Sequence, residues 1–312
     1  MRLGMGGRML WLAVAVLCLS GCPSGERSRH TVSATVQTVG ETPTVGLAIS
    51  NIGNPFFKIL KQGAEQGARE CGLRLQVVDA RDNTETQQAE IKALIAQKVR
   101  VLLVNPTDSQ RLVGSVAAAN RAGIPVITLD RSVDAGNVVA HISSDNMAGG
   151  RMAGEYIKHR LGGKGRVVEL LGVRGASSTI ERDQGFAMVL NGAKGLHLLA
   201  RESANFDRAK AEAMMAKIIA RYGEIDAVFA LNDEMALGAE RALRAAGQNR
   251  TLIVGFDASA EGLAAIRAGK MAATIAQRPD LIGHQAVLAA CRVLDKAPVE
   301  TYIPIPLELV NI

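Results

Sequence analysis

Two stretches of the chain repeat one order of features: VLLVNPTDSQRLVGSVAAANRAGIPVITLD (residues 101–130) and AVFALNDEMALGAERALRAAGQNRTLIVGFD (residues 227–257). Each begins with a short apolar run that predicts a buried strand. An amphipathic segment that predicts a helix follows, and a second apolar run ends the stretch. Each stretch is therefore a strand–helix–strand unit of a parallel sheet, and the repeat indicates two similar lobes.

Polar residues follow the strands at matching places in the two stretches. Asn105 and Asp130 come after the strands of the first stretch, and Asn232 and Asp257 come after those of the second, 25 residues apart in both. Ligands of open α/β sheets bind outside the carboxyl ends of the strands. If the lobes face each other, these four side chains converge on one cleft.

Alternation of strands and helices continues on both sides of the repeat. The further predicted strands are 44–50, 73–78, 167–171, 197–200 and 272–276. The predicted helices include 55–71, 84–97, 109–122, 208–221 and 234–246, with a further one around residue 291. The fold class is α/β, with two doubly wound parallel-sheet lobes.

Length and composition agree with two aliphatic lobes and weigh against nucleic-acid binding. The chain has 312 residues, 48% of them apolar, and only 6 Phe, 3 Tyr and 1 Trp. At roughly 100–200 residues per domain, that length favours two domains. The 36 basic residues exceed the 30 acidic ones only mildly, and no basic cluster is interleaved with aromatic residues.

The N-terminus predicts export. Basic residues in 1–8 precede an apolar run at 9–19, which is too short for a membrane span of about 20 residues. Leu19-Ser20-Gly21-Cys22 is typical of a bacterial lipobox, so we expect a signal peptide over 1–21, a lipid on Cys22 and a flexible tether over 22–43. The protein would be anchored on the extracytoplasmic side of the membrane. The alternative is an ordinary signal with an incidental cysteine.

Two cysteines remain after the signal and the lipobox are set aside. Cys71 and Cys291 lie 220 residues apart and lack the spacing of a zinc site, so no metal is expected. Both fall in predicted helices, where buried free thiols are common. Free thiols are therefore favoured over a disulfide, although export would permit one.

Many polar and aromatic residues stand at strand ends or at helix starts, and one, Arg182, lies within a helix. They are Ser50, Asn54, Phe56, Phe57, Asn105, Asp130, Arg131, Ser144, Arg182, Phe206, Asn232, Phe256, Asp257 and Gln277. A sugar needs this mixture, because each hydroxyl both donates and accepts a hydrogen bond and aromatic rings cover its C–H faces. The alternative for any single Asn or Asp is a turn or a helix cap, as we expect for Asp207 and Asp233. Phe186 and Phe229 are expected in the core.

Catalytic motifs are missing from the sequence. It contains no Walker A motif, no dinucleotide-binding glycine motif after a strand, no H-E-x-x-H and no G-x-S-x-G. Arg131 is expected to keep Asp130 ionised with a lowered pKa, which is unsuitable for the general acid of a glycosidase. A non-enzymatic protein without a cofactor is therefore expected.

Several motifs resemble a known family. They are Asn54-Pro55-Phe56-Phe57, Val104-Asn105-Pro106-Thr107-Asp108-Ser109, Thr128-Leu129-Asp130-Arg131, Asn232-Asp233-Glu234-Met235-Ala236, Gly255-Phe256-Asp257 and Thr274-Ile275-Ala276-Gln277. Together they resemble the type I periplasmic sugar-binding proteins of bacterial ABC transport, in their D-ribose-binding branch, from about residue 44 to 312. Val173-Arg174, at an edge of the cleft, departs from the family pattern.

The resemblance implies a hinge of three crossing segments near 144–145, 277–278 and 304–306. The N-terminal lobe would then be 44–144 with 278–305, and the C-terminal lobe 145–277 with 306–312. The implied sugar contacts are Asn54, Phe56, Phe57, Asp130, Arg131, Arg182, Phe206, Asn232, Phe256, Asp257 and Gln277, and the implied supporting residues are Ser50, Asn105 and Ser144. Phe56 and Phe206 would flank the sugar ring, while Phe57 and Phe256 would line the wall.

The implied function is the capture of D-ribose and its delivery, by a monomer, to an ABC permease with ATPase subunits. The alternatives are another sugar such as allose, xylose or a furanosyl signal, and a sugar sensor read by a chemoreceptor. A transcription regulator would need an N-terminal helix-turn-helix where this chain has a signal sequence. A glycosidase is the remaining alternative.

Overall fold

The computed structural model describes residues 42–311, and residues 41–312 form one compact unit. The predicted signal peptide, Cys22 and most of the predicted tether lie outside the described residues. Among the residues described, no helix is both long enough and apolar enough to cross a membrane. The unit contains two six-stranded sheets, in the orders β11-β5-β4-β3-β1-β2 and β12-β10-β9-β8-β6-β7.

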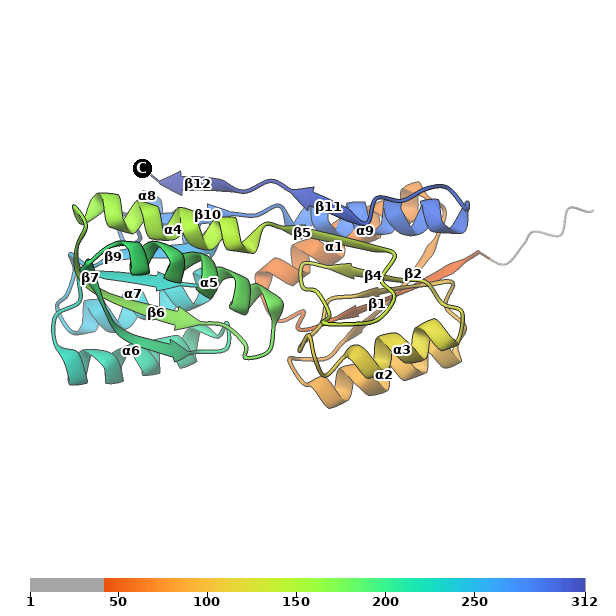
Figure 1. Cartoon of the computed structure of the whole chain (residues 1–312), viewed down its shortest axis with the longest axis horizontal. Helices are drawn as coiled ribbons and strands as arrows, with labels where there is room; N and C mark the ends of the chain where they lie inside the picture. The colour runs from red at the N-terminus through yellow and green to blue at the C-terminus, as the bar shows by residue number, and fades with distance from the viewer. Residues whose placement is uncertain (1–41, 312) are drawn as a thin grey trace, which may run out of the picture. The chain divides into compact units, whose positions relative to one another are not determined.

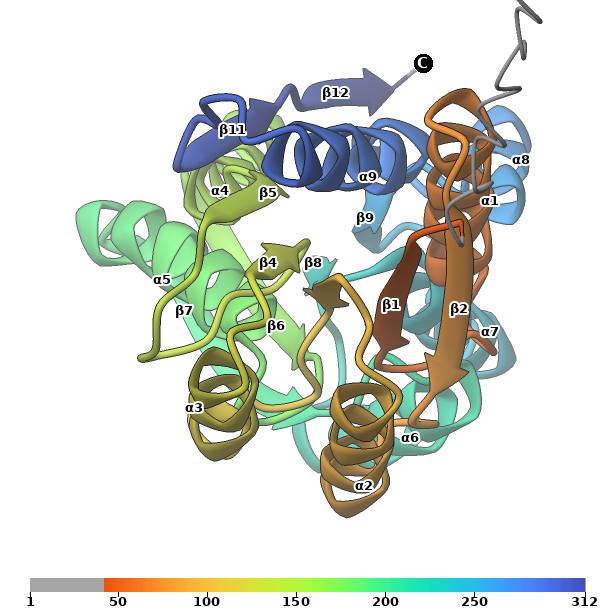
Figure 2. The ribbon, with the colours of Figure 1, turned by 90° about the vertical axis from the view of Figure 1, so that its right-hand side faces the viewer.

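The N-terminal lobe is built on the first sheet, in which all strands are parallel. Its strands are β1 (Thr44–Ile49), β2 (Arg74–Asp79), β3 (Val101–Val104), β4 (Val126–Leu129), β5 (Ala140–Ser144) and β11 (Tyr302–Ile305). Its helices are α1 (Pro55–Glu70), α2 (Thr84–Ala96), α3 (Val113–Arg121) and α9 (Pro279–Leu294). Helices α1 and α9 cover one face and α2 and α3 the other, each pair over its own apolar cluster (Figure 2).

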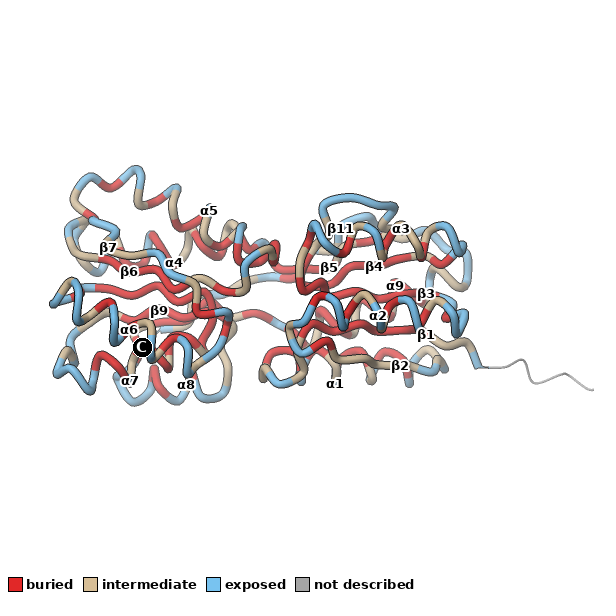
Figure 3. The backbone as a smooth tube through the Cα atoms, turned by 90° about the horizontal axis from the view of Figure 1, so that it is seen from below, coloured by how far each residue is buried: buried red, intermediate tan, exposed pale blue. Residues whose placement is uncertain are grey.

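The C-terminal lobe is built on the second sheet, whose edge strand β12 runs antiparallel to β10. Its strands are β6 (Lys164–Leu171), β7 (Gly195–Ser203), β8 (Ala227–Ala230), β9 (Leu252–Asp257), β10 (Ala273–Ala276) and β12 (Glu308–Asn311). Its helices are α4 (Asn146–Arg160), α5 (Ser177–Gly192), α6 (Arg208–Tyr222), α7 (Asp233–Ala245) and α8 (Ala260–Arg267). The strands run through the buried centre of each lobe, as Figure 3 shows.

The predicted α/β fold with two parallel-sheet lobes is confirmed, with additions at the sheet edges. Strands β5, β11 and β12 were not predicted: β5 and β12 carry no distinct apolar run, and β11 contains Pro304, which argues against a strand. Helix α3 begins at Val113 rather than at residue 109. Phe186 and Phe229 pack in the core as expected, with ring centroids 4.8 Å apart.

The chain passes between the two sheets three times: from β5 to α4, from β10 to α9, and from β11 to β12 (Figure 1). Because β11 and β12 are the last strands of the chain, each sheet is completed by residues far from it in sequence. We retain 44–144 with 278–305 and 145–277 with 306–312 as the proposed lobe boundaries.

Cys71 and Cys291 form a disulfide, so the expectation of free thiols was wrong. Helices α1 and α9 approach so closely that a Cβ on Gly63 would lie 2.0 Å from the Asp280 carbonyl oxygen, and one on Gly283 would lie 1.9 Å from that of Leu60. This packing brings the Cα atoms of the two cysteines to 6.4 Å, within the range of a disulfide. The pairing depends on the contact between the first and last helices, which spacing in the sequence does not reveal.

We expect the double variant Cys71→Ser/Cys291→Ser to unfold at a Tm lower by roughly 5–15 °C, because the bond closes a long loop in the unfolded chain. Differential scanning calorimetry with and without reductant checks this. Reductant should lower the Tm of the wild type and leave that of the double variant unchanged. Two titratable thiols in the natively exported protein would contradict the disulfide.

Candidate functional site

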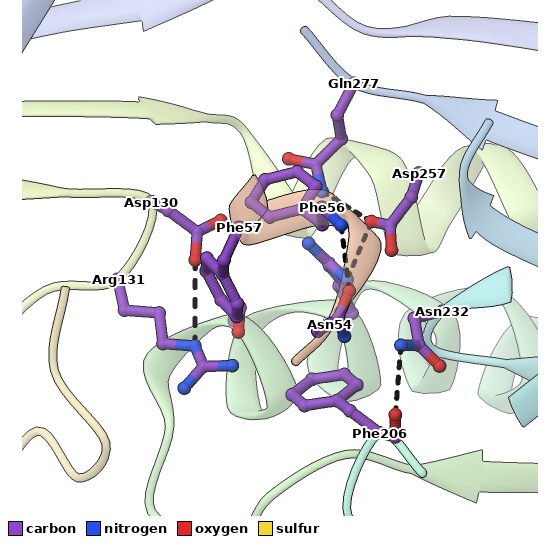
Figure 4. A pocket seen from close by; sticks show the side chains of 11 residues that line it. Asn54, Phe56, Phe57, Asp130, Arg131, Phe206, Asn232, Asp257 and Gln277 are labelled. Carbon is purple, nitrogen blue, oxygen red and sulfur yellow. Dashed lines mark hydrogen bonds and ion pairs between the residues drawn. The ribbon is translucent and has the colours of Figure 1, made fainter. Parts of the chain in front are cut away.

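A cavity lies at the carboxyl ends of both sheets, between the lobes (Figure 4). The cavity is small: the centre of a water molecule can occupy a volume of about 20 Å³ within it, which leaves room only for a small ligand. The walls are formed by Asn54, Phe56, Phe57, Asp130, Arg131, Ser178, Arg182, Phe206, Asn232, Asp257 and Gln277. Ten of the eleven predicted contact residues are therefore brought together, and Phe256 is not in the wall.

The start of α1 places two aromatic rings in the cavity. The Oδ1 of Asn54 caps the helix by accepting a hydrogen bond from the Phe56 N–H at 2.9 Å. This cap fixes the first turn, in which the Phe56 and Phe57 rings meet edge to face with centroids 5.1 Å apart. Both rings are buried, so α1 presents a rigid apolar surface to a ligand.

Arg131 joins the aromatic residues of the two lobes. Its guanidinium carbon lies 5.2 Å from the ring centroid of Phe57 in the N-terminal lobe and 5.3 Å from that of Phe206 in the C-terminal lobe. A guanidinium at this distance is attracted to the ring face. Contacts of Arg131 therefore stabilise the closed arrangement of the lobes.

A buried hydrogen-bond chain positions Asp130. Asn105 Nδ2 donates to Asp130 Oδ2 at 2.9 Å, and Ser50 Oγ donates to Asn105 Oδ1 at 2.7 Å. Neither Ser50 nor Asn105 lines the cavity; both are buried, and this chain reaches the cavity through Asp130. Ser144, the third predicted supporting residue, ends β5 with its Oγ buried and without a hydrogen-bond partner among the described residues.

The expectation of a lowered pKa for Asp130 was wrong. Burial raises the pKa of this carboxyl, and the Arg131 charge, with its Nε 3.6 Å from Asp130 Oδ2, opposes the rise without cancelling it. A fully enclosed carboxylate loses more hydration than one neighbouring cation restores. Burial was the missing quantity, because the sequence showed only the adjacent arginine.

Asp257 has the corresponding place in the C-terminal lobe. Gln277 Nε2 donates to its Oδ1 at 2.8 Å, and an Arg182 guanidinium nitrogen lies 3.9 Å from the same oxygen. Burial raises the pKa of Asp257 to about 8, although Arg182 lowers it. The carboxyls of Asp130 and Asp257 are thus both held away from water in the closed cleft.

Arg182 is fixed from three sides. Its Nε donates to Asn146 Oδ1 at 2.8 Å, and another guanidinium nitrogen donates to the Leu231 carbonyl oxygen at 2.6 Å. The ring of Phe256 lies behind it, with the guanidinium carbon 3.7 Å from the ring centroid. Phe256 therefore contacts Arg182 and does not line the cavity.

Asn232 caps helix α7 and also faces the cavity. Its Oδ1 accepts from the Met235 N–H at 3.0 Å, and its Nδ2 lies 3.4 Å from the Phe206 carbonyl oxygen. Asp233, predicted as a cap, is instead buried and accepts from Ser259 N–H and Thr274 Oγ1. The expected capping role of Asp207 is confirmed, since its Oδ1 accepts from Lys210 N–H at the start of α6.

Two polar atoms of the cavity residues are fully enclosed by protein and have no hydrogen-bond partner among residues 42–311. They are the donor Nε of Arg131 and the acceptor Oε1 of Gln277, both buried. A buried polar group without a partner is unfavourable. A ligand with hydroxyl groups supplies both an acceptor and a donor, so it can satisfy both atoms.

The lobes also touch directly at one edge of the cleft. Ser109 N–H donates to the Gly175 carbonyl oxygen, and Ser132 N–H donates to Ser177 Oγ, both at 2.9 Å. Gly175 has φ +85°, and a Cβ there would lie 2.4 Å from an Asp108 carboxylate oxygen. Only glycine therefore allows this contact between the lobes without displacement.

Comparison with known proteins gives a consistent result. Residues 45–298 match the family described as periplasmic binding protein domain. The ribose import binding protein of Haemophilus influenzae is 45% identical over 268 residues, covering 86% of this chain and 91% of that protein. The ribose import binding protein of Escherichia coli is 43% identical over 267 residues, covering 86% and 90%.

A solved structure shares the architecture. The Caulobacter myo-inositol binding protein, bound to myo-inositol, superposes with a TM-score of 0.84 at 31% identity, covering 87% of this chain and 94% of that one. The sequence matches, the shared fold and a cavity between two lobes thus all indicate the same family. The chain belongs to the periplasmic binding protein domain family.

Proposed function

We propose that this protein is the substrate-binding component of an ABC sugar importer and that it captures D-ribose between its two lobes. The observation that carries the proposal is the cavity, whose wall combines two carboxylates, two guanidiniums, three amides and three phenylalanine rings. The ribose import binding proteins at 43–45% identity support D-ribose as the sugar.

The polar wall suits a ligand whose every substituent is a hydroxyl. Asp130 and Asp257 would accept from sugar hydroxyls, and Arg131 and Arg182 would donate to sugar oxygens. Phe56 and Phe206 would cover the two faces of the sugar ring and exclude water, which strengthens those hydrogen bonds. Asn54, Phe57, Asn232 and Gln277 would complete the contacts, and Phe256 would act by holding Arg182 in place.

Binding would be coupled to closure of the lobes. A ligand shifts an equilibrium between two states only by its difference in affinity for them. Wall residues from both lobes supply that difference, because an open cleft offers the sugar only one half of the site. The closed form would then dock on a permease and deliver the sugar for ATP-driven import.

The protein would work as an exported monomer held by a lipid on Cys22, facing the periplasm in a Gram-negative cell. The lipobox pattern supports this attachment, and two or more acyl chains are enough for stable anchoring. Replacement of Cys22 by Ser should move the protein from the membrane fraction to the soluble extracytoplasmic fraction. Unchanged membrane association would contradict the lipid anchor.

We expect D-ribose to bind with measurable heat and to raise the Tm. At 100 times its dissociation constant, a ligand adds about 2.7 kcal/mol of stability. Asp257→Asn should weaken binding roughly 10- to 150-fold, since an NH₂ group replaces one of the two carboxyl oxygens and cannot accept a hydrogen bond from a sugar hydroxyl. The exposed Asp295→Asn serves as the control and should bind as the wild type does.

Titration calorimetry with ribose, allose, xylose and arabinose distinguishes the proposed ligand from the alternatives. No heat and no thermal stabilisation at millimolar ribose would refute ribose as the ligand. Tighter binding of another sugar would assign the same site to that sugar. Release of nitrophenol from nitrophenyl glycosides would reveal a glycosidase instead, and none is expected.

Gly175→Ala should weaken the binding of every sugar by the same factor, roughly tenfold or more, because its methyl group meets Asp108 when the lobes close. Gly162→Ala is the matched control, since Gly162 also has a positive φ, +62°, but a Cβ there would have no atom within 4 Å. Calorimetry on both variants separates the steric effect from backbone strain. Equal affinities of the two variants would argue against the contact as part of closure.

A further inference from the structure

We propose that Ser178 is a specificity-determining residue of the sugar site, with its hydroxyl pairing to one hydroxyl of the bound sugar. The inference rests on the proposed function and refines it. Ser178 is the one cavity residue that the resemblance did not predict. No spacing or motif distinguished it from the hydroxyl residues beside it.

Three successive hydroxyl residues open helix α5, and only Ser178 lines the cavity. Ser177 Oγ is occupied by the Ser132 N–H from the other lobe at 2.9 Å. Thr179 Oγ1 is buried away from the cavity wall. Since successive helix residues point about 100° apart, one turn directs these three side chains to three different surroundings.

The Ser178 hydroxyl is available to a ligand. The residue is only 2% exposed, and no hydrogen bond within residues 42–311 uses its Oγ. A hydroxyl can donate one hydrogen bond and accept others, so it can pair with a sugar hydroxyl in either sense. Unlike Arg131 Nε and Gln277 Oε1, the Ser178 Oγ is not fully enclosed by protein, so it opens to the cavity, where a ligand can reach it.

The position of Ser178 is fixed by the packing of its helix. A Cβ on Gly150 of α4 would lie 2.1 Å from the Arg182 carbonyl oxygen of α5, and one on Gly185 of α5 would lie 2.1 Å from that of Met147. Helices in backbone contact cannot shift to follow a ligand. Ser178 would therefore contact the bound sugar at one fixed position.

A fixed neutral hydroxyl distinguishes between sugars in a different way from the charged groups around it. Asp130, Asp257, Arg131 and Arg182 provide several oxygens or N–H groups that can pair with alternative hydroxyl arrangements. A site that is built to pair with a given hydroxyl rejects the analogue lacking it, because the protein group is then left without a partner. We therefore expect Ser178 to select for one hydroxyl of the pentose.

The test compares wild type with Ser178→Ala by titration calorimetry against D-ribose and deoxy analogues that each lack one hydroxyl. Ser178→Ala should weaken D-ribose binding roughly 3- to 30-fold. One deoxy analogue should bind equally to both proteins, since it lacks the hydroxyl that Ser178 contacts. For the other analogues, the substitution should cause the same loss as for ribose.

Thr179→Val is the matched control, because it removes a hydroxyl from the same helical turn without touching the cavity. It should leave every sugar affinity unchanged, and thermal unfolding without sugar verifies that both variants fold. Wild-type affinity of Ser178→Ala for ribose would overturn the inference, as would an equal loss for all the analogues. If the wild type binds ribose, either result leaves the proposed function intact; if it binds no sugar, the proposed function fails first and the inference with it.

Discussion

The two lobes enclose ionisable side chains between them, and this enclosure governs the hydrogen bonding of the whole site. Asp130, Arg131 and Arg182 are almost fully buried between the lobes, and the Asp257 side chain is 10% exposed. Burial raises the pKa of both carboxyls. Removing such groups from water is unfavourable unless each finds partners. Their mutual contacts, the Asn105 and Gln277 amides and the aromatic rings offset only part of that loss, so closure favours a ligand that completes the hydrogen bonding.

The lobes can impose that constraint because their helices are packed rigidly behind the cavity. Helix α1, which carries Phe56 and Phe57, is in backbone contact with α9 and joined to it by the disulfide. Helix α5, which carries Arg182 and Ser178, is in backbone contact with α4. We therefore expect each half of the site to move as part of its lobe, with motion concentrated in the three connecting segments.

Most of the site could be predicted because its chemistry lies at strand ends, where a change from apolar to polar residues is visible in the sequence. Asn105, Asp130, Asn232 and Asp257 follow apolar runs at matching intervals, and parallel strands bring their carboxyl ends to one edge. Ser178 lacked such a signal, because a hydroxyl at the start of a helix resembles an ordinary capping residue. Phe256 had the expected position at the end of its strand, but its ring points behind Arg182.

Local patterns in the chain predicted the α/β class, the two similar lobes and the residue types of the site, because strand and helix periodicity and strand-end polarity are local properties. The packed molecule added the Cys71–Cys291 disulfide, the raised pKa of Asp130, the buried place of Asp233 and the completion of each sheet by β11 or β12. Each of these depends on burial or on contacts between residues far apart in the chain. A local sequence pattern reveals neither burial nor long-range contacts, since both arise only when the helices and sheets pack together.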